Sequence, residues 1–251
     1  MSATLTGRHA PEPAARGLPP AARRRRTRLT AVLSSVAALW RSRAVPREEP
    51  SAADLALLRA AGRGDADAVR AALARGARLE TRDADGRTPL LRAALADHVQ
   101  AARALVAAGA DVDARDDRQD SPWLVTGVTG SVAMMRALLP GGPDVTLTNR
   151  FGGVSVIPAS ERGHVDYVRA VLAETGTDVD HVNRLGWTAL LEAVILGDGG
   201  RVHQEVVEVL LAAGADPSLP DGEGTTALAH AERRGFTGIA AVLRRAEGGR
   251  R

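Results

Sequence analysis

The sequence contains no cysteine and no lysine, and it is poor in aromatic residues. The absence of cysteine excludes disulfide bonds, thiolate metal sites and catalysis by a thiol. Aromatic residues account for 2% of the 251 residues, although 45% of the residues are apolar. A core with so few rings has to be built from small aliphatic side chains, which suits repeated units that stack closely.

The basic residues, all of them arginine, are concentrated at the start of the chain. Residues 1–50 hold ten arginines and three acidic residues, a net charge of +7, so the total of +3 leaves −4 for the remainder. A protein that binds nucleic acid would carry its positive charge on the folded domain. The charge distribution therefore does not favour specific nucleic-acid binding, and it predicts a basic, largely disordered tail over residues 1–49.

Within this tail, residues 29–40 form a short, uncharged segment of mostly apolar or small residues. The segment is too short to span a membrane as a helix, which takes about 20 residues. Three interpretations remain open: a helix that caps the folded part or is loosely ordered, a signal peptide that ends at Ala44, and an amphipathic helix on an anionic membrane surface.

A turn motif recurs along the rest of the chain at intervals of 33 to 38 residues. Each copy begins with Asp or Asn, and glycine follows three residues later in most copies. The copies start at Asp83, Asp116, Asn149, Asn183 and Asp221, and a degenerate first copy fits residues 50–82. A fixed period of this length is the signature of a repeat architecture.

Equivalent positions of the copies share the same chemistry. One position is always apolar: Leu57, Leu90, Trp123, Val156, Leu190 and Leu228. The third residue after it is always small: Ala60, Ala93, Thr126, Ala159, Ala193 and Ala231. Four residues further, most copies have glycine. This order predicts two helices that pack closely in each unit, the first of them ended by glycine.

The segments Thr88-Pro89-Leu90 and Gly109-Ala110-Asp111-Val112-Asp113-Ala114 make the chain resemble the ankyrin repeat family. The stretch from Leu185 to Gly200 is also similar to that of small ankyrin-repeat proteins of bacteria. The resemblance implies an all-α solenoid of about six helix–turn–helix units joined by β-hairpin loops. It places the ankyrin domain at residues 50–246, with repeats at about 50–82, 83–115, 116–148, 149–182, 183–220 and 221–246.

The histidines and one insertion are the first candidates for a special role. His98, His164 and His203 occupy the same position after the break of the first helix, and this recurrence indicates a structural role in capping and turning the chain. The residues from Asp198 to Val202 lengthen the turn of repeat five, which predicts a loop that contacts a partner. No glycine-rich phosphate motif follows a strand pattern.

A second group of candidates lies where repeats four and five meet. It comprises Asn149, Arg150, Glu161, Arg162, His181, Asn183, Trp187 and Glu192. We expect these side chains to serve structure or partner recognition, and a small-molecule or metal pocket, even an enzymatic one, is the alternative. The pattern of Glu161 and Glu192 does not match a known acid–base pair.

We therefore expect a monomeric module, neither an enzyme nor dependent on a cofactor, that binds another protein through a concave surface of hairpins and first helices. The alternative is an adaptor that its arginine-rich tail tethers to a membrane surface or an anionic polymer. A cytoplasmic location is expected, or export if residues 1–44 are a signal peptide. Exposed Phe151, Leu185 and Trp187 are the expected anchors. The predicted partner-binding residues are Arg87, Arg118, Arg150, Phe151, Arg184, Leu185, Trp187 and Glu192.

Overall fold

The computed structural model describes residues 49–249, which form six pairs of helices. The first helices of the pairs are α2 (Ala52–Arg63), α4 (Pro89–Leu95), α6 (Pro122–Thr129), α8 (Val156–Glu161), α10 (Ala189–Ile195) and α12 (Ala227–Arg233). The second helices are α3 (Ala66–Ala74), α5 (Val99–Ala107), α7 (Val132–Leu138), α9 (Val165–Glu174), α11 (Arg201–Ala212) and α13 (Thr237–Gly248). A short 3-10 turn, η1 (Leu139–Gly141), follows α7.

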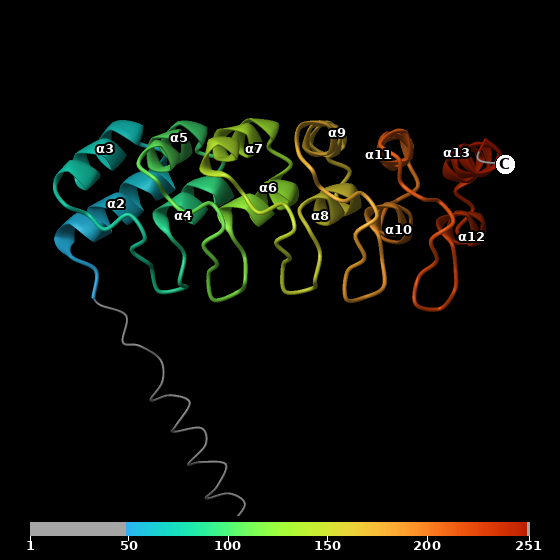
Figure 1. Ribbon diagram of the computed structural model, residues 1–251, viewed down its shortest axis with the longest axis horizontal. Coiled ribbons are helices and arrows are strands. Elements are labelled where there is room, and N and C mark those ends of the chain that lie inside the picture. Colours follow the sequence, from blue (N-terminus) through green and yellow to red (C-terminus); the bar gives the residue numbers. More distant parts are fainter. Residues whose placement is uncertain (1–48, 250–251) are drawn as a thin grey trace, which may run out of the picture. The chain divides into compact units, whose positions relative to one another are not determined.

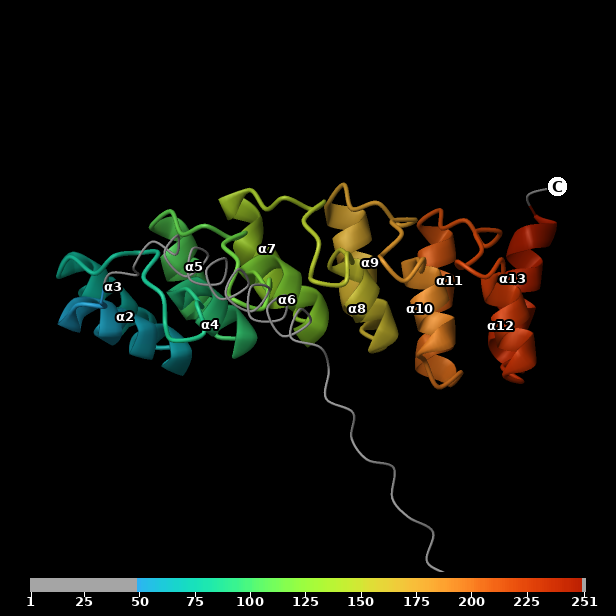
Figure 2. The ribbon, with the colours of Figure 1, turned by 90° about the horizontal axis from the view of Figure 1, so that it is seen from below.

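The helix pairs stack side by side in chain order. The first helices form one layer, the second helices form another, and the loops between pairs all project beyond the first helices (Figure 1). Viewed from below, the helix axes turn gradually from one end of the stack to the other (Figure 2). The predicted solenoid of helix–turn–helix units is confirmed.

Local sequence explains where the first helices begin. Thr88, Ser121, Thr188 and Thr226 precede these helices, and each hydroxyl accepts a hydrogen bond from the backbone N–H three residues later. Such a cap satisfies one of the N–H groups that have no partner inside the helix. Proline follows the cap in α4 and α6, where its fixed φ angle suits the first turn and its missing N–H is not needed.

The turn between the two helices of a pair contains a left-handed residue. In repeats one, three, four and six this residue is the glycine that the sequence predicts at the end of the first helix, for example Gly64 with φ +76° and Gly130 with φ +70°. Repeat two has Asp97 there, with φ +55°. Repeat five differs, because Gly199 (φ +73°) and not Gly197 is left-handed. The insertion has moved the turn by two residues.

The core follows the predicted columns of equivalent positions. All six small residues from Ala60 to Ala231 are buried, so successive first helices pack closely. Trp123 and the aliphatic residues at its position are buried too, except Leu228 in the last repeat, which is only partly buried. That repeat has a neighbour on one side only.

The loops that join the pairs are hairpin turns closed by backbone hydrogen bonds. The N–H of Asp83 donates to the carbonyl of Arg87 at 3.0 Å, and the other four loops repeat this bond. Within residues 49–249 no strand forms, and one isolated antiparallel bridge joins Pro220 and Thr226.

The interpretations of the N-terminal segment, including the signal peptide over residues 1–44 and the apolar segment 29–40, lie outside the described residues. Among the helices that are described, none is sufficiently long and apolar to cross a membrane.

Candidate partner-binding face

Each hairpin is held by the side chain of the Asp or Asn that starts it. The Oδ1 atom of Asn183 accepts hydrogen bonds from the N–H groups of Leu185 at 2.9 Å and Trp187 at 3.1 Å. The same two bonds are made by Asp83, Asp116, Asn149 and Asp221. The backbone of every hairpin tip is therefore fixed, and it presents its outer side chains in a constant direction.

Most of the predicted contact residues lie exposed on these tips. Phe151 is 51% exposed and Leu185 is 55% exposed. Arg118, Arg150 and Arg184 are exposed as well. The guanidinium of Arg150 lies over the Phe151 ring, 4.5 Å from its centre, which orients this aromatic side chain.

Three of the predicted contact residues are not exposed. Arg87 is half-buried and forms ion pairs with Asp83 and Asp85 of its own hairpin. Trp187 is half-buried and packs against the hydrophobic core, so the expectation of an exposed ring is wrong. Its position is the return arm of the hairpin, which leads into α10. Glu192, on α10, is only 6% exposed.

A pocket of about 270 Å³ lies beside these tips, and we call it the junction pocket. Hairpins and first helices of repeats three, four and five contribute to its wall. Four of the eight large apolar side chains that are exposed in the described residues line it: Val128, Phe151, Leu185 and Leu196. The sequence did not single out Val128 and Leu196, although each stands at the end of a first helix, where an apolar side chain has no core to enter.

The junction pocket also contains most of the polar cluster that was predicted where repeats four and five meet. Its wall includes Asn149, Arg150, Glu161, Arg162, Asn183 and Glu192. His181 is not part of the wall, and its Nε2 atom lies 2.7 Å from the carbonyl oxygen of Gly152. The structure therefore brings six of the eight predicted residues into one pocket.

Glu192 occupies a position that repeats two and six use for a base. In repeat two, Arg92 donates to the turn residue Asp83 at 2.8 Å, and in repeat six the Nε2 atom of His230 lies 2.7 Å from Asp221. In repeat five the turn residue is Asn183, and its Nδ2 atom donates to Oε1 of Glu192 at 2.8 Å. The acid thus stands on the helix, and its partner is a neutral amide.

This environment changes the acidity of Glu192. Burial raises the pKa of Glu192 to about 7, and the nearby Glu161 carboxylate also raises it. The hydrogen bond from Asn183 and the charge of Arg162 act in the opposite direction and only reduce the shift. At neutral pH this carboxyl group is therefore divided between its protonated and ionised forms.

The recurring histidines connect neighbouring repeats. In each case the Nε2 atom lies close to a backbone carbonyl oxygen of the preceding repeat. The distances are 3.2 Å from His98 to Gly62, 3.2 Å from His164 to Val128 and 2.9 Å from His203 to Glu161. A carbonyl only accepts, so each Nε2 atom carries the proton. The predicted structural role holds, but the rings bond the preceding repeat and do not cap their own helices.

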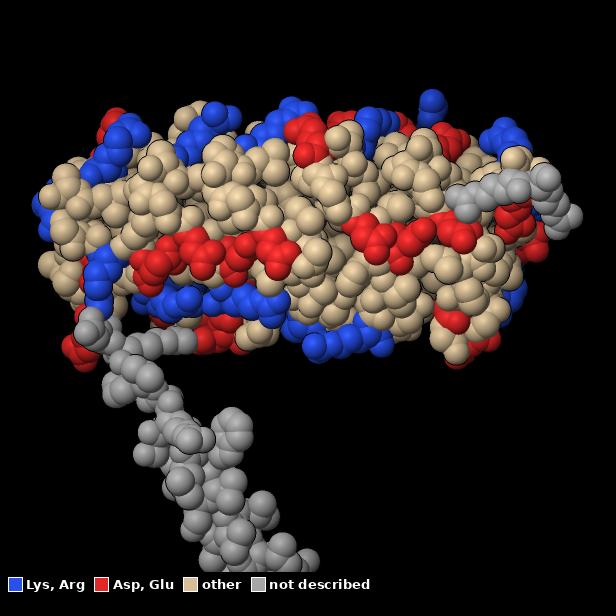
Figure 3. All heavy atoms as spheres, in the orientation of Figure 1, with Lys and Arg blue, Asp and Glu red and all other residues tan. Residues whose placement is uncertain are grey.

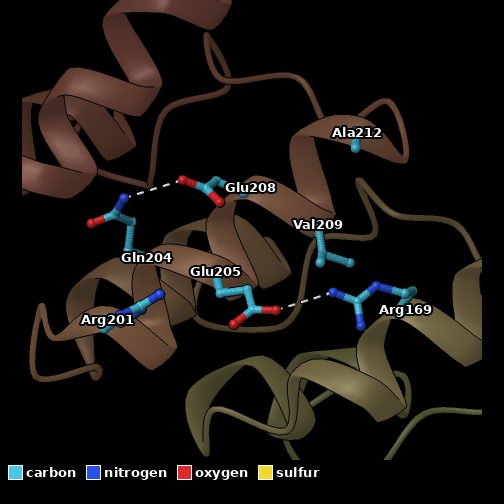
Figure 4. Close-up of a pocket in the computed structure, with 7 residues that line it drawn as sticks. All are labelled: Arg169, Arg201, Gln204, Glu205, Glu208, Val209 and Ala212. Atoms are coloured by element: carbon cyan, nitrogen blue, oxygen red, sulfur yellow. Dashed lines mark hydrogen bonds and ion pairs between the residues drawn. The ribbon is translucent and has the colours of Figure 1, made fainter.

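A wider hollow lies on the opposite layer, between α9 and α11. Its volume is about 670 Å³, and Figure 4 shows its mostly charged lining. Arg169 pairs with Glu205 at 3.2 Å, and Gln204 donates to Glu208 at 3.1 Å, so these groups satisfy one another across an exposed surface. Such a surface lacks the apolar anchors that dominate binding interfaces.

Acidic side chains gather in a row across one face of the repeats, with arginines beside them (Figure 3). Three carboxylates that follow the second helices bind the backbone of the next repeat. They are Glu80 with the N–H of Asp111, Asp113 with that of Asp144, and Asp180 with that of Asp216. These carboxylates therefore stabilise the stacking of neighbouring repeats. Among the described residues, no group of three or more histidine or acidic side chains could hold a metal ion.

Comparison with known proteins agrees with this architecture. Residues 39–116 and 125–221 match the family model described as ankyrin repeats in three copies, which is more than half of the chain. The chain belongs to the ankyrin repeat family. Ankyrin repeat domains generally mediate protein–protein interaction, and the family is generally non-enzymatic.

Individual relatives include bacterial proteins. The ankyrin repeat protein YahD of Escherichia coli (strain K12) is 49% identical over 94 residues, or 38% of this chain and 47% of YahD, so the match spans about half the length of YahD. Cyclin-dependent kinase 4 inhibitor B of Bos taurus is 35% identical over 39% of this chain and 70% of that protein. The crystal structure of an ankyrin repeat domain from Acinetobacter baumannii AYE has a TM-score of 0.72 and 46% identity, covering 76% of this chain and 97% of that one.

Proposed function

We propose that the chain binds another protein through the hairpin tips and first helices of repeats three to five, with the junction pocket at the centre. The observation that carries this proposal is the concentration of exposed apolar side chains at one place. Half of the large exposed apolar residues in the described chain line the junction pocket. Exposed apolar side chains that gather around one pocket, beside charged groups, are typical of interaction sites.

Three further findings support a protein as the ligand. Phe151 and Leu185 stand on adjacent hairpins whose backbones are fixed by Asn149 and Asn183, so little order has to be gained on binding. The pocket volume of about 270 Å³ lies below the range of about 300–1,000 Å³ usual for small-molecule sites. One of the relatives is named as an inhibitor of a cyclin-dependent kinase, and the target in that name is itself a protein.

The test is a pair of matched variants of the full chain. The partner is first captured with the wild-type protein, and its Kd is then measured by calorimetry with purified components. Phe151→Ala with Leu185→Ala should weaken binding by about 2 kcal/mol or more, roughly 30-fold in Kd, because both anchors are removed. Leu55→Ala, which changes an apolar residue of repeat one that is 42% exposed, is the control and should bind as the wild type does. Equal affinities of all three proteins would place the binding face elsewhere.

A further inference from the structure

Glu192 is a buried acid whose counter-charge is missing from its own repeat. Where repeats two and six pair an aspartate with Arg92 or His230, repeat five pairs Glu192 with an amide. The Oε1 atom accepts the Asn183 bond, and Oε2 accepts no hydrogen bond from any residue between 49 and 249. A carboxylate that is 6% exposed is costly to ionise without a cation beside it.

The other charged groups of the pocket wall are already paired. Arg150 lies 3.7 Å from Asp120, and Arg162 lies 3.0 Å from Glu161. Two arginines thus balance two carboxylates, and Glu192 is the fifth charge. When it is ionised, the wall has a net charge of −1.

Within residues 49–249, no cation on a neighbouring element forms an ion pair with Glu192. On α11, His203 is paired with Asp198 at 2.8 Å, and on α12, His230 is paired with Asp221. Arg234, which directly follows α12, donates to the carbonyl groups of Val194 and Gly197, at the end of α10. At the end of α8, the charges near Glu192 are those of Glu161 and Arg162, which pair with each other.

The size and rim of the pocket restrict what can supply the missing charge. About 270 Å³ holds one long side chain better than a whole small molecule. The apolar rim of Phe151, Leu185 and Leu196 suits the methylene stem of lysine or arginine, which packs on apolar surface while its head stays polar.

We propose that the junction pocket receives one basic side chain of the bound partner, an arginine or a lysine, and that Glu192 is the carboxylate that pairs with it. This inference rests on the proposed function, because it names what the partner inserts. It also links binding to protons. A cation beside Glu192 favours the ionised form, so the proton held by a group with a pKa of about 7 is released on binding.

The experiment titrates the full chain with small probes and follows the side-chain amide signal of Asn183 by NMR. The probes are Nα-acetyl-argininamide, Nα-acetyl-lysinamide and the neutral isostere Nα-acetyl-citrullinamide. At least one basic probe should shift the signal to saturation in the millimolar range, and the one that binds more tightly identifies the preferred head group. Citrullinamide should fail to saturate. The tighter basic probe should bind about tenfold more tightly at pH 8 than at pH 6.

Glu192→Gln is the decisive variant, because glutamine can still accept the Asn183 bond while it carries no charge. It should bind the basic probe at least tenfold more weakly and lose the pH dependence. The matched control, Glu208→Gln on the exposed face of α11, should behave as the wild type does. Equal binding of citrullinamide, undiminished binding by Glu192→Gln, or no saturation with either basic probe would overturn the proposal. These results are independent of the test with the Phe151 and Leu185 variants, because that test measures binding of the partner protein itself.

Discussion

Repeats two and five use the same hairpin and the same helix position to hold opposite arrangements of charge. In repeat two, Asp83 accepts hydrogen bonds from the backbone of its hairpin and from Arg92, so acid and base neutralise each other within the unit. In repeat five, Asn183 holds the hairpin in the same way, but Glu192 stands on the helix. The fold tolerates both arrangements because the backbone needs only one side-chain oxygen at the turn.

In repeats two, five and six, the second polar atom of the turn residue explains which side chain pairs with it. The free oxygen of an aspartate needs a donor, and arginine or histidine supplies it in repeats two and six. The amide nitrogen of Asn183 has two hydrogens and needs an acceptor, which Glu192 supplies. In repeat five the charge of the helix residue is therefore the opposite of that in repeat two, and a buried acid stands at the centre of the candidate face.

Repeats two and five should differ in their polar pairs, and the hairpin of repeat five should contribute little to the core. Trp123→Ala sets the scale, because the ring is fully buried, and it should lower the free energy of unfolding by about 3–5 kcal/mol. Trp187→Ala removes a half-buried ring and should lower it by about 1–2 kcal/mol. Urea denaturation of both variants measures the difference. If both variants lose the same free energy of unfolding, Trp187 belongs to the core, and repeats two and five differ in more than their polar pairs.

The next effect concerns pH. The pKa of Glu192 is raised in the fold above its ordinary value of 4.5, so the folded chain keeps a proton that the unfolded chain releases. The free energy of unfolding should therefore fall as the pH rises from about 4.5 to about 7, by up to about 3 kcal/mol. Glu192→Gln should lack this decrease and be the more stable protein at pH 8. Parallel curves for wild type and variant would mean that Glu192 is ionised without penalty.

Arg92→Met removes the base from the pair in repeat two and should have a smaller effect on the free energy of unfolding. Burial opposes ionisation of Asp83, but the backbone bond from Arg87 and the side chains of Arg92 and Arg87 outweigh it and lower the pKa. The stabilisation from a lowered pKa is present above the ordinary value of 3.8 and disappears as the pH falls through the folded value. The variant should lose about 1–2 kcal/mol at pH 7 and less at pH 3. A loss that does not depend on pH would indicate packing of the methylene stem instead.

The smallest effect should come from converting repeat five into repeat two. The double variant Asn183→Asp with Glu192→Arg recreates the pair of Asp83 and Arg92, so its stability at pH 8 should be within about 1 kcal/mol of that of Glu192→Gln. Thermal melts between pH 5 and pH 8 check this, and the basic probes should no longer bind. Marked destabilisation would show that other residues around Glu192, and not Asn183 alone, require an acid at this position.

Much of the fold was predictable from sequence because its columns repeat. Leu57, Leu90 and Trp123 share one chemistry, and a position that recurs six times identifies its own environment. The contents of the pocket were predictable in part, since Asn183 and Glu192 already stood out at the junction. Their hydrogen bond was not predictable, because residues nine apart across a hairpin meet only when the turn geometry is known. The burial of Trp187 was missed because its position is polar in other repeats, such as Arg87.

The bonds between neighbouring repeats also determine how the stack would respond to mechanical load. At four of the five borders, a side chain bonds to a carbonyl group at the end of the first helix of the preceding repeat. These side chains are His98, His164, His203 and Arg234. At the border between repeats two and three the equivalent residue is Ser131, whose hydroxyl caps its own helix. In a row of units that touch only their neighbours, a pulling force passes through every border in series. Under load, the border between repeats two and three should therefore depend on its remaining bonds, among them the one from the N–H of Asp144 to the carboxylate of Asp113.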